Sequence, residues 1–379
     1  MNLPGLERAS FLRRPNRFTV ECALRGKTVR AYLPNPGRLW ETLLPGRTVY
    51  LRSDGAHRKL RYTAAAAERG GAPVPLETGR ANGLFRELLE GGRLPGLEGW
   101  RVRRAEVPVG RSRFDFLLVK GRREMLLEVK SCTLFHETLA MFPDAVTERG
   151  RRHLLGLAEE KKRGLEAGVA FLVHSGGARF FLPDYHTDIA FSRTLHALRN
   201  ELLVKPYGID WGGGLAVKGV RELSIPWGVL EGEMAGGGAY VLVLRLRRGR
   251  RLSAGGLGSL HFRSGYYLYA GSARRGLEAR LARQRRKRKA RRWHVDYLRE
   301  AADVVSALAI RSSGDLECAL AEALAEISEA SAPGFGSSDC GCRSHLFFMP
   351  DNPISDPRFV DVLLRFRMGM VEERLAASW

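Results

Sequence analysis

Residues 114–131 read Phe-Asp-Phe-Leu-Leu-Val-Lys-Gly-Arg-Arg-Glu-Met-Leu-Leu-Glu-Val-Lys-Ser, and the fold of the first half of the chain depends on them. Two strand-like runs, 114–120 and 125–130, flank the short polar turn 121–123, which predicts a β-hairpin. Glu128 and Lys130 lie two positions apart and therefore share one face of the second strand. When the hairpin folds back, Asp115 comes beside Glu128, so two carboxylates and an ammonium group meet at one end of a sheet.

This set of side chains has a definite chemical use. Two convergent carboxylates suit a hard divalent cation, Mg²⁺ or Mn²⁺, and a neighbouring lysine can orient or deprotonate a water molecule. Together they are what the hydrolysis of a phosphodiester requires. The alternative is that Asp115, Glu128 and Lys130 are ordinary solvated charges at strand ends, because the spacing alone is a weak motif.

The charge balance indicates a polyanionic partner. The chain has 379 residues, 62 basic and 41 acidic, and a formal net charge of +21. Arginine is far commoner than lysine, which coding bias would explain, but bias does not explain the surplus of positive charge. We therefore expect DNA and/or RNA as the partner.

The five cysteines are odd in number and form no secreted disulfide framework. The N-terminus has no signal-peptide core, and no apolar run approaches about 18 residues. We expect a cytoplasmic protein with no membrane association. The sequence does not indicate an oligomeric state.

The first half divides into a β-rich part and an α/β part. Short strand-like runs at 18–24, 28–33 and 48–51, separated by turn signals, fit a small barrel of the oligonucleotide-binding (OB) type. A helix at 82–91 carries Glu87, which we expect to be a solvated carboxylate rather than a third acid of the metal site. A strand at 101–109, the hairpin, a helix to about residue 168 and a strand at 169–174 follow, and we expect Asp144 to cap that helix rather than to complete the site.

Three segments of the first half resemble a known family. They are the hairpin at 114–131, the turn Leu33-Pro34-Asn35-Pro36-Gly37-Arg38, and the long run Ala140-Met141-Phe142-Pro143-Asp144-Ala145-Val146-Thr147-Glu148-Arg149-Gly150. The N-terminal 205 to 227 residues resemble the sugar fermentation stimulation protein (SfsA) family. The resemblance implies an OB-like subdomain followed by a PD-(D/E)XK nuclease-like core, with Asp115 and Glu128 as metal ligands and Lys130 as the catalytic lysine. Pro36 departs from the family pattern, where a small hydroxyl residue is expected.

The second half begins after a glycine-rich stretch, 206–238, which we interpret as the domain boundary. Strands are expected at 238–246, 259–262 and 265–272, and a helix from Gly276 that continues towards His294. Between Arg274 and Arg292 eleven of nineteen residues are basic, which is typical of a phosphate-contacting surface. The candidate nucleic-acid-binding residues are Arg274, Arg275, Arg283, Arg285, Arg286, Lys287, Arg288, Lys289, Arg291 and Arg292.

Residues 232–349 resemble a GIY-YIG-like nuclease domain of uncharacterised type. Its first signature would be Gly238-Ala239-Tyr240 and its second Tyr269-Ala270-Gly271. The resemblance implies catalytic roles for Tyr240, Tyr269 and Arg280, and Glu317 as the metal carboxylate. A phenol can relay a proton, an arginine can neutralise the scissile phosphate, and a carboxylate can hold one Mg²⁺. On periodicity alone, the tyrosines are ordinary strand aromatics.

Cys340-x-Cys342-x₂-His345 offers up to three soft metal ligands, with Cys318 or His294 as a fourth. No second cysteine pair closes a regular zinc pattern, so we expect a turn of small residues here rather than a zinc site. A C-terminal helix is expected at 358–376, with an apolar face that suits docking on a domain.

We therefore expect an α/β and α+β protein in five parts: an OB-like β-barrel subdomain (1–80), a PD-(D/E)XK-like α/β core (81–227), a linker (228–237), a small GIY-YIG-like α+β domain (238–349) and a C-terminal helix (350–379). The predicted function is divalent-metal-dependent cleavage of DNA or RNA. The alternative is a non-catalytic DNA-binding or regulatory protein that retains nuclease folds. A sugar-metabolising activity, which the family name brings to mind, has no matching site in the residues.

Overall fold

The computed structural model describes residues 5–54, 59–110, 112–235 and 237–377, which form two compact units. The first unit extends to Trp227, apart from residues 185–187, and the second consists of those three residues and the chain from Gly228 onward. The stretch 206–227 therefore belongs to the first unit, and the helix α4 (Trp227–Glu233) lies where a linker is expected.

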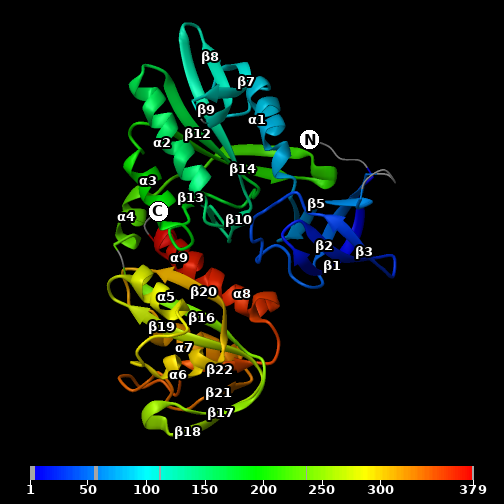
Figure 1. Cartoon of the computed structure of the whole chain (residues 1–379). Coiled ribbons are helices and arrows are strands. Elements are labelled where there is room, and N and C mark those ends of the chain that lie inside the picture. The colour runs from blue at the N-terminus through cyan, green and yellow to red at the C-terminus, as the bar shows by residue number, and fades with distance from the viewer. Residues whose placement is uncertain (1–4, 55–58, 111, 236, 378–379) are drawn as a thin grey trace. The chain divides into compact units, whose positions relative to one another are not determined.

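The first unit opens with a closed β-barrel, drawn in blue in Figure 1. Its strands follow the order β3-β2-β1-β4-β5-β6, and a parallel pairing of Ala31 and Tyr32 with β5 closes it. Val20, Cys22, Val49 and Leu51 fill its interior. The expected OB-like barrel is confirmed. The strands are β1 (Glu7–Asn16), β2 (Thr19–Leu24), β3 (Lys27–Tyr32), β4 (Thr48–Ser53), β5 (Tyr62–Arg69) and β6 (Ala72–Pro75).

A six-stranded mixed sheet forms the rest of this unit, in the order β15-β14-β12-β9-β8-β7. The hairpin β8–β9 is confirmed, with Lys120 paired to Arg123 across the turn. A smaller sheet, β10-β11-β13, accompanies it. The strands are β7 (Arg101–Val109), β8 (Ser112–Lys120), β9 (Arg123–Cys132), β10 (Leu134–Phe135), β11 (Leu139–Phe142), β12 (Glu166–Val173), β13 (Phe180–Pro183), β14 (Leu203–Trp211) and β15 (Val217–Glu222).

Helices cover both faces of the six-stranded sheet. α1 (Ala81–Glu90) packs with Leu127 on one face, and α2 (Glu148–Lys162) packs with Leu126 on the other (Figure 1). α3 (Ile189–Ala197) lies against α2. The expectation that α2 runs to about residue 168 is wrong: the helix ends at Lys162, and Gly164, with φ +99°, turns the chain into β12.

Asp144 does not cap α2, contrary to the prediction. The N-cap is Thr147, whose side chain accepts a hydrogen bond of 3.0 Å from the backbone N–H of Gly150. The Asp144 carboxylate instead accepts backbone N–H groups of Leu39 and Arg38 on the barrel, and burial raises its pKa. A Cβ on Gly37 would lie 2.1 Å from Asp144 Oδ2, so only glycine admits this carboxylate. The residue joins the barrel to the α/β core.

The second unit is built on a five-stranded sheet in the order β20-β16-β19-β22-β21. β16 lies between β20 and β19 and is antiparallel to both. β17 and β18 form a separate hairpin. The strands are β16 (Gly238–Leu246), β17 (Arg250–Ser253), β18 (Ser259–Phe262), β19 (Gly265–Ala273), β20 (Asp303–Arg311), β21 (Ala330–Ser331) and β22 (Leu346–Met349), and the helices are α5 (Leu277–Arg285), α6 (His294–Ala301), α7 (Glu317–Ile327), α8 (Pro357–Leu364) and α9 (Met370–Ala377).

Two helix predictions here need correction. The helix through the basic run stops at Arg285, where Arg286 turns to an extended conformation, and α6 starts again at His294. Like charges at helical spacing destabilise a helix, which explains the break within the five consecutive basic residues 285–289. The C-terminal helix is interrupted by a π-helical turn over 365–369. Across the described ranges, no helix is both long enough and apolar enough to cross a membrane.

Candidate functional site

Asp115 lies on β8 and is held from two sides. Its Oδ1 atom accepts a hydrogen bond of 2.7 Å from the Asn82 side chain on α1, and its Oδ2 atom accepts one of 2.8 Å from the backbone N–H of Val129. Phe116 pairs with Leu127 in the hairpin, so the next position sets Asp115 opposite Glu128. The structure thus brings the predicted carboxylates together.

Glu128 lies on β9 with its side chain only 5% exposed. Its Oε1 atom accepts hydrogen bonds from Lys130 Nζ and, at 2.5 Å, from His153 Nδ1. Arg149 Nε lies 3.4 Å from His153 Nε2, which makes Nε2 the acceptor and leaves the ring proton on Nδ1, facing Glu128. The predicted Lys130 therefore stands beside Glu128, and His153 is an additional residue of the site.

The two carboxyl groups have pKa values that move apart. Burial, and then the negative charge of Glu128, raises the pKa of Asp115. Burial also acts to raise the pKa of Glu128, but the hydrogen bond from His153 and the charge of Lys130 outweigh it, so the pKa is lowered. Divergent pKa values in a pair of carboxylates are typical of functional sites.

The residues fit a divalent cation. Glu128 Oε2 is buried and has no hydrogen-bond partner within the described ranges, which leaves an anionic oxygen that a cation would satisfy. Both oxygens of Asp115 are already oriented by donors, as metal-binding carboxylates commonly are. Sequence reasoning missed Asn82 and His153, because both reach the site from helices and neither belongs to the hairpin pattern.

In the second unit, the two tyrosine signatures lie on neighbouring strands. Tyr240 on β16 pairs with Gly271 on β19, and a Cβ on Gly271 would lie 2.5 Å from the Tyr240 ring. The centroids of the Tyr240 and Tyr269 rings are 6.3 Å apart. Burial raises the pKa of both phenols, so both are protonated at neutral pH and can donate a hydrogen bond. The Tyr240 oxygen itself accepts a hydrogen bond of 3.2 Å from Gln284 Nε2.

Arg280 and Glu317 line the same cavity as the two tyrosines, with a volume of about 720 Å³. The guanidinium of Arg280 stacks 4.2 Å from the Trp293 ring centroid. Glu317 Oε2 accepts a hydrogen bond from Ser272 Oγ, and Glu317 Oε1 lies 3.3 Å from His345 Nδ1. The four residues that the sequence predicts are thus brought together, with Ser272, Trp293 and His345 as neighbours that it did not predict to belong to this site.

The predicted phosphate-contacting residues fall into three groups. Arg274, Arg275, Arg291 and Arg292 line the cavity. Arg285, Arg286, Lys287 and Arg288 are exposed at the end of α5 and beyond it. Arg283 and Lys289 are engaged by Asp296, at 2.9 and 2.8 Å, with Lys289 only 6% exposed. The first two groups can face a polyanion, whereas the third supports the fold.

The chain does turn at Cys340-x-Cys342, but the turn also brings potential metal ligands together. Cys318, at the start of α7, completes a set of four potential ligands with Cys340, Cys342 and His345. His294, the other candidate for the fourth position, instead accepts the backbone N–H of Gly336 at 3.1 Å. Cys318, one of the two candidates that the sequence offers for the fourth position, is therefore the one that lies with the other three, although it stands 22 residues before Cys340 on a helix.

The fold and these sites define a chain that joins two nuclease-type folds, an OB-barrel-linked restriction-endonuclease-like domain and a GIY-YIG-like domain. Family models match in the same order: the SfsA N-terminal OB domain at residues 12–76, the sugar fermentation stimulation protein RE domain at 79–212, and DUF123, a domain of unknown function, at 239–367.

Relatives and a solved structure agree with this assignment. A sugar fermentation stimulation protein homolog of Methanothermobacter thermautotrophicus is 38% identical over 224 residues, 58% of this chain and 93% of the relative. A homolog of Moorella thermoacetica is 42% identical over 199 residues, 52% of this chain and 86% of the relative. The structure of Pyrococcus furiosus SfsA in complex with Ca²⁺ is 30% identical, covers 59% of this chain and 97% of that chain, and has a TM-score of 0.54. The chain belongs to the SfsA family, with a DUF123 domain in its C-terminal half.

Proposed function

We propose that this protein is a divalent-metal-dependent nuclease whose principal site is formed by Asp115, Glu128 and Lys130. The observation that carries the proposal is that the buried Oε2 atom of Glu128, opposite Asp115, has no hydrogen-bond partner among the described residues. Two convergent carboxylates repel a phosphate group unless a cation lies between them, and a protein that only binds nucleic acid has no need of them. The Ca²⁺ complex of the Pyrococcus furiosus relative supports a cation in this family.

Each residue has a defined task in this account. Asp115 and Glu128 would hold Mg²⁺ or Mn²⁺, which when bound polarises the phosphate and activates water. Asn82 and the Val129 N–H keep Asp115 oriented, and His153 does the same for Glu128. The Lys130 ammonium, half-buried beside Glu128, can donate to the attacking water or to a phosphate oxygen.

The second unit offers a further candidate site. Tyr240, Tyr269, Arg280 and Glu317 line one cavity whose rim carries four exposed arginines. Protonated phenols can donate to a phosphate oxygen, Arg280 can neutralise charge on the phosphate, and Glu317 can ligate a cation. This arrangement supports binding of a phosphodiester in the cavity, and we propose that the same residues also cleave it.

The test is a cleavage assay with the full chain on labelled single-stranded DNA, duplex DNA and RNA, with Mg²⁺, Mn²⁺, Ca²⁺ or EDTA. We expect Mg²⁺ or Mn²⁺ to support cleavage of at least one substrate and EDTA to abolish it. Binding is followed in parallel by fluorescence anisotropy. Tight binding without cleavage of any substrate under all these conditions would contradict the nuclease and favour the non-catalytic binder.

A further inference from the structure

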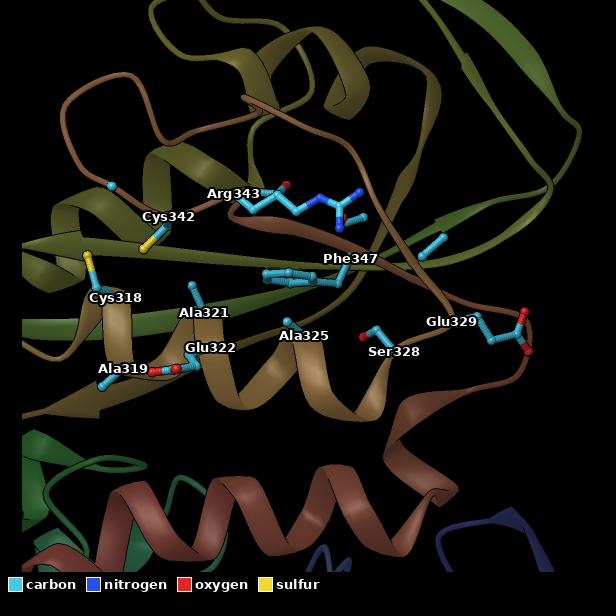
Figure 2. A pocket seen from close by; sticks show the side chains of 14 residues that line it. Cys318, Ala319, Ala321, Glu322, Ala325, Ser328, Glu329, Cys342, Arg343 and Phe347 are labelled. Atoms are coloured by element: carbon cyan, nitrogen blue, oxygen red, sulfur yellow. The ribbon is translucent and has the colours of Figure 1, made fainter.

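The strongest unassigned cluster in the chain is the group Cys318, Cys340, Cys342 and His345. Cys318 is the second residue of α7, whereas the other three belong to the loop that leads into β22. Their potential ligand atoms all lie within 4.8 Å of one another. Figure 2 shows Cys318 on its helix and Cys342 on the loop with their sulfur atoms turned towards the same place, at one end of a hollow floored by α7.

The spacing of these atoms fits a single ion. Cys340 Sγ lies 3.4 Å from His345 Nε2. A tetrahedral zinc site with Zn–S bonds of about 2.3 Å and Zn–N bonds of about 2.0 Å has ligand–ligand distances of roughly 3.5–3.8 Å. A multi-iron cluster needs its ligands farther apart, around a larger body. Three sulfurs and one imidazole nitrogen form one of the common donor sets of structural zinc sites.

The imidazole of His345 is already fixed in the orientation that a metal ligand needs. The residue is 1% exposed, its backbone N–H donates to Phe335 O at 2.8 Å, and its carbonyl accepts from Ala270 N–H at 2.9 Å. Nε2 faces the cysteines, while Nδ1 lies 3.3 Å from Glu317 Oε1. A carboxylate behind a histidine is the usual support for a zinc-bound imidazole.

We propose that Cys318, Cys340, Cys342 and His345 bind one Zn²⁺ ion as a closed structural site. The ion links the first turn of α7 to the loop before β22. Both segments form walls of the second unit's cavity: Glu317 comes from α7, and Gly336, Ser338 and Asp339 come from the loop. Zinc binding therefore holds Glu317 and the loop in place. The metal site stands whether or not the proposed nuclease activity is found.

A disulfide explains the cluster less well. The five cysteines are all free thiols in the structure, and any one disulfide among Cys318, Cys340 and Cys342 leaves the third thiol over. A disulfide also does not explain why the buried imidazole of His345 faces the sulfur atoms. Zinc uses all four groups at once, and Cys318, the exposed member, provides a route for the ion to enter.

The test is elemental analysis of the reduced full chain after treatment with a weak chelating resin, followed by titration with Zn²⁺ and Co²⁺. We expect one tightly held zinc per chain, and a Co²⁺ derivative with thiolate charge-transfer and tetrahedral d–d absorption. Cys318→Ser and Cys342→Ser should weaken zinc binding by at least about tenfold and alter the Co²⁺ spectrum. Cys22→Ala, which removes a buried thiol inside the barrel, is the matched control and should bind zinc normally.

Several outcomes would overturn the proposal. One is a reduced wild-type chain that takes up neither Zn²⁺ nor Co²⁺. Another is zinc content that is unchanged in both cysteine variants. Iron with its own visible chromophore, or a disulfide among these cysteines in protein purified without oxidant, would also refute it. Cys318 is exposed, so its serine variant tests the site without disturbing the core.

Discussion

The Nδ1 atom of His153 on α2 lies 2.5 Å from the Oε1 atom of Glu128 on β9. A histidine outside the hairpin therefore fixes one of the two carboxylates that face each other across it. His153 is only 5% exposed and its Nδ1 atom faces Glu128, so we expect it to position that carboxylate.

The first prediction concerns that positioning. His153→Leu removes the N–H donor and should lower Mg²⁺-dependent cleavage about tenfold or more, with the Mg²⁺ midpoint moved to higher concentration. His153→Asn places an amide N–H near the position of Nδ1 and should retain most of the activity. Cleavage rate measured against Mg²⁺ concentration is the readout, and equal midpoints for the Leu variant and wild type would exclude the role.

The second prediction concerns the Tyr240–Gly271 pair. Gly271→Ala places a methyl group where the Tyr240 ring lies, so the free energy of unfolding should fall by about 1–3 kcal/mol. Gly232→Ala on α4 is the control, because a Cβ there meets nothing within 4 Å. Urea unfolding of both variants gives the comparison. A Gly271→Ala chain as stable as the control would show that the ring does not occupy this position.

The third prediction concerns pH. Burial acts to raise the pKa of Asp296, but hydrogen bonds from Arg283 and Lys289 and from two backbone N–H groups lower it to about 2. A carboxylate whose pKa is lowered by folding stabilises the fold at any pH above its pKa in the unfolded chain, which is about 3.9. This stabilisation is lost as the pH falls through the folded-state pKa of about 2. Asp296→Asn should lower the free energy of unfolding by about 2 kcal/mol at pH 7. The difference in stability between the variant and the wild type should become smaller below about pH 4. A difference in melting temperature between wild type and Asp296→Asn that stays constant from pH 7 to pH 3 would contradict this account.

The fourth prediction concerns the basic surface beyond α5. Replacing Arg286, Lys287 and Arg288 with Gln removes three exposed charges. Each lost phosphate contact should reduce the slope of log affinity against log salt by about 1. Replacing Arg247, Arg248 and Arg250, which are also exposed in the same unit, changes the net charge equally and should alter the slope less. Equal effects of the two triple variants would assign the binding to net charge alone.

Local patterns predicted the hairpin β8–β9 and the strands β7, β16 and β18 well, because alternation and turn residues lie within a few positions of one another. β1 was missed: two register shifts break its alternation, and half of its residues are charged or proline-adjacent. Asp144 was misjudged for a different reason: its partner, the 37–39 turn, is brought to it by tertiary packing, which no short pattern records. For the same reason the sequence left open whether Cys318 or His294 joins the loop at 340–345.

The central claim is that Asp115 and Glu128 hold the catalytic cation, and single-turnover cleavage by the full chain in Mg²⁺ tests it most directly. Asp115→Asn and Glu128→Gln should each lower the rate by at least about a hundredfold while nucleic-acid affinity is retained. Glu90→Gln, an exposed carboxylate at the end of α1, should cleave as wild type does. Glu317→Gln, run in parallel, reports on the second site. Wild-type rates in both Asp115→Asn and Glu128→Gln would contradict the account.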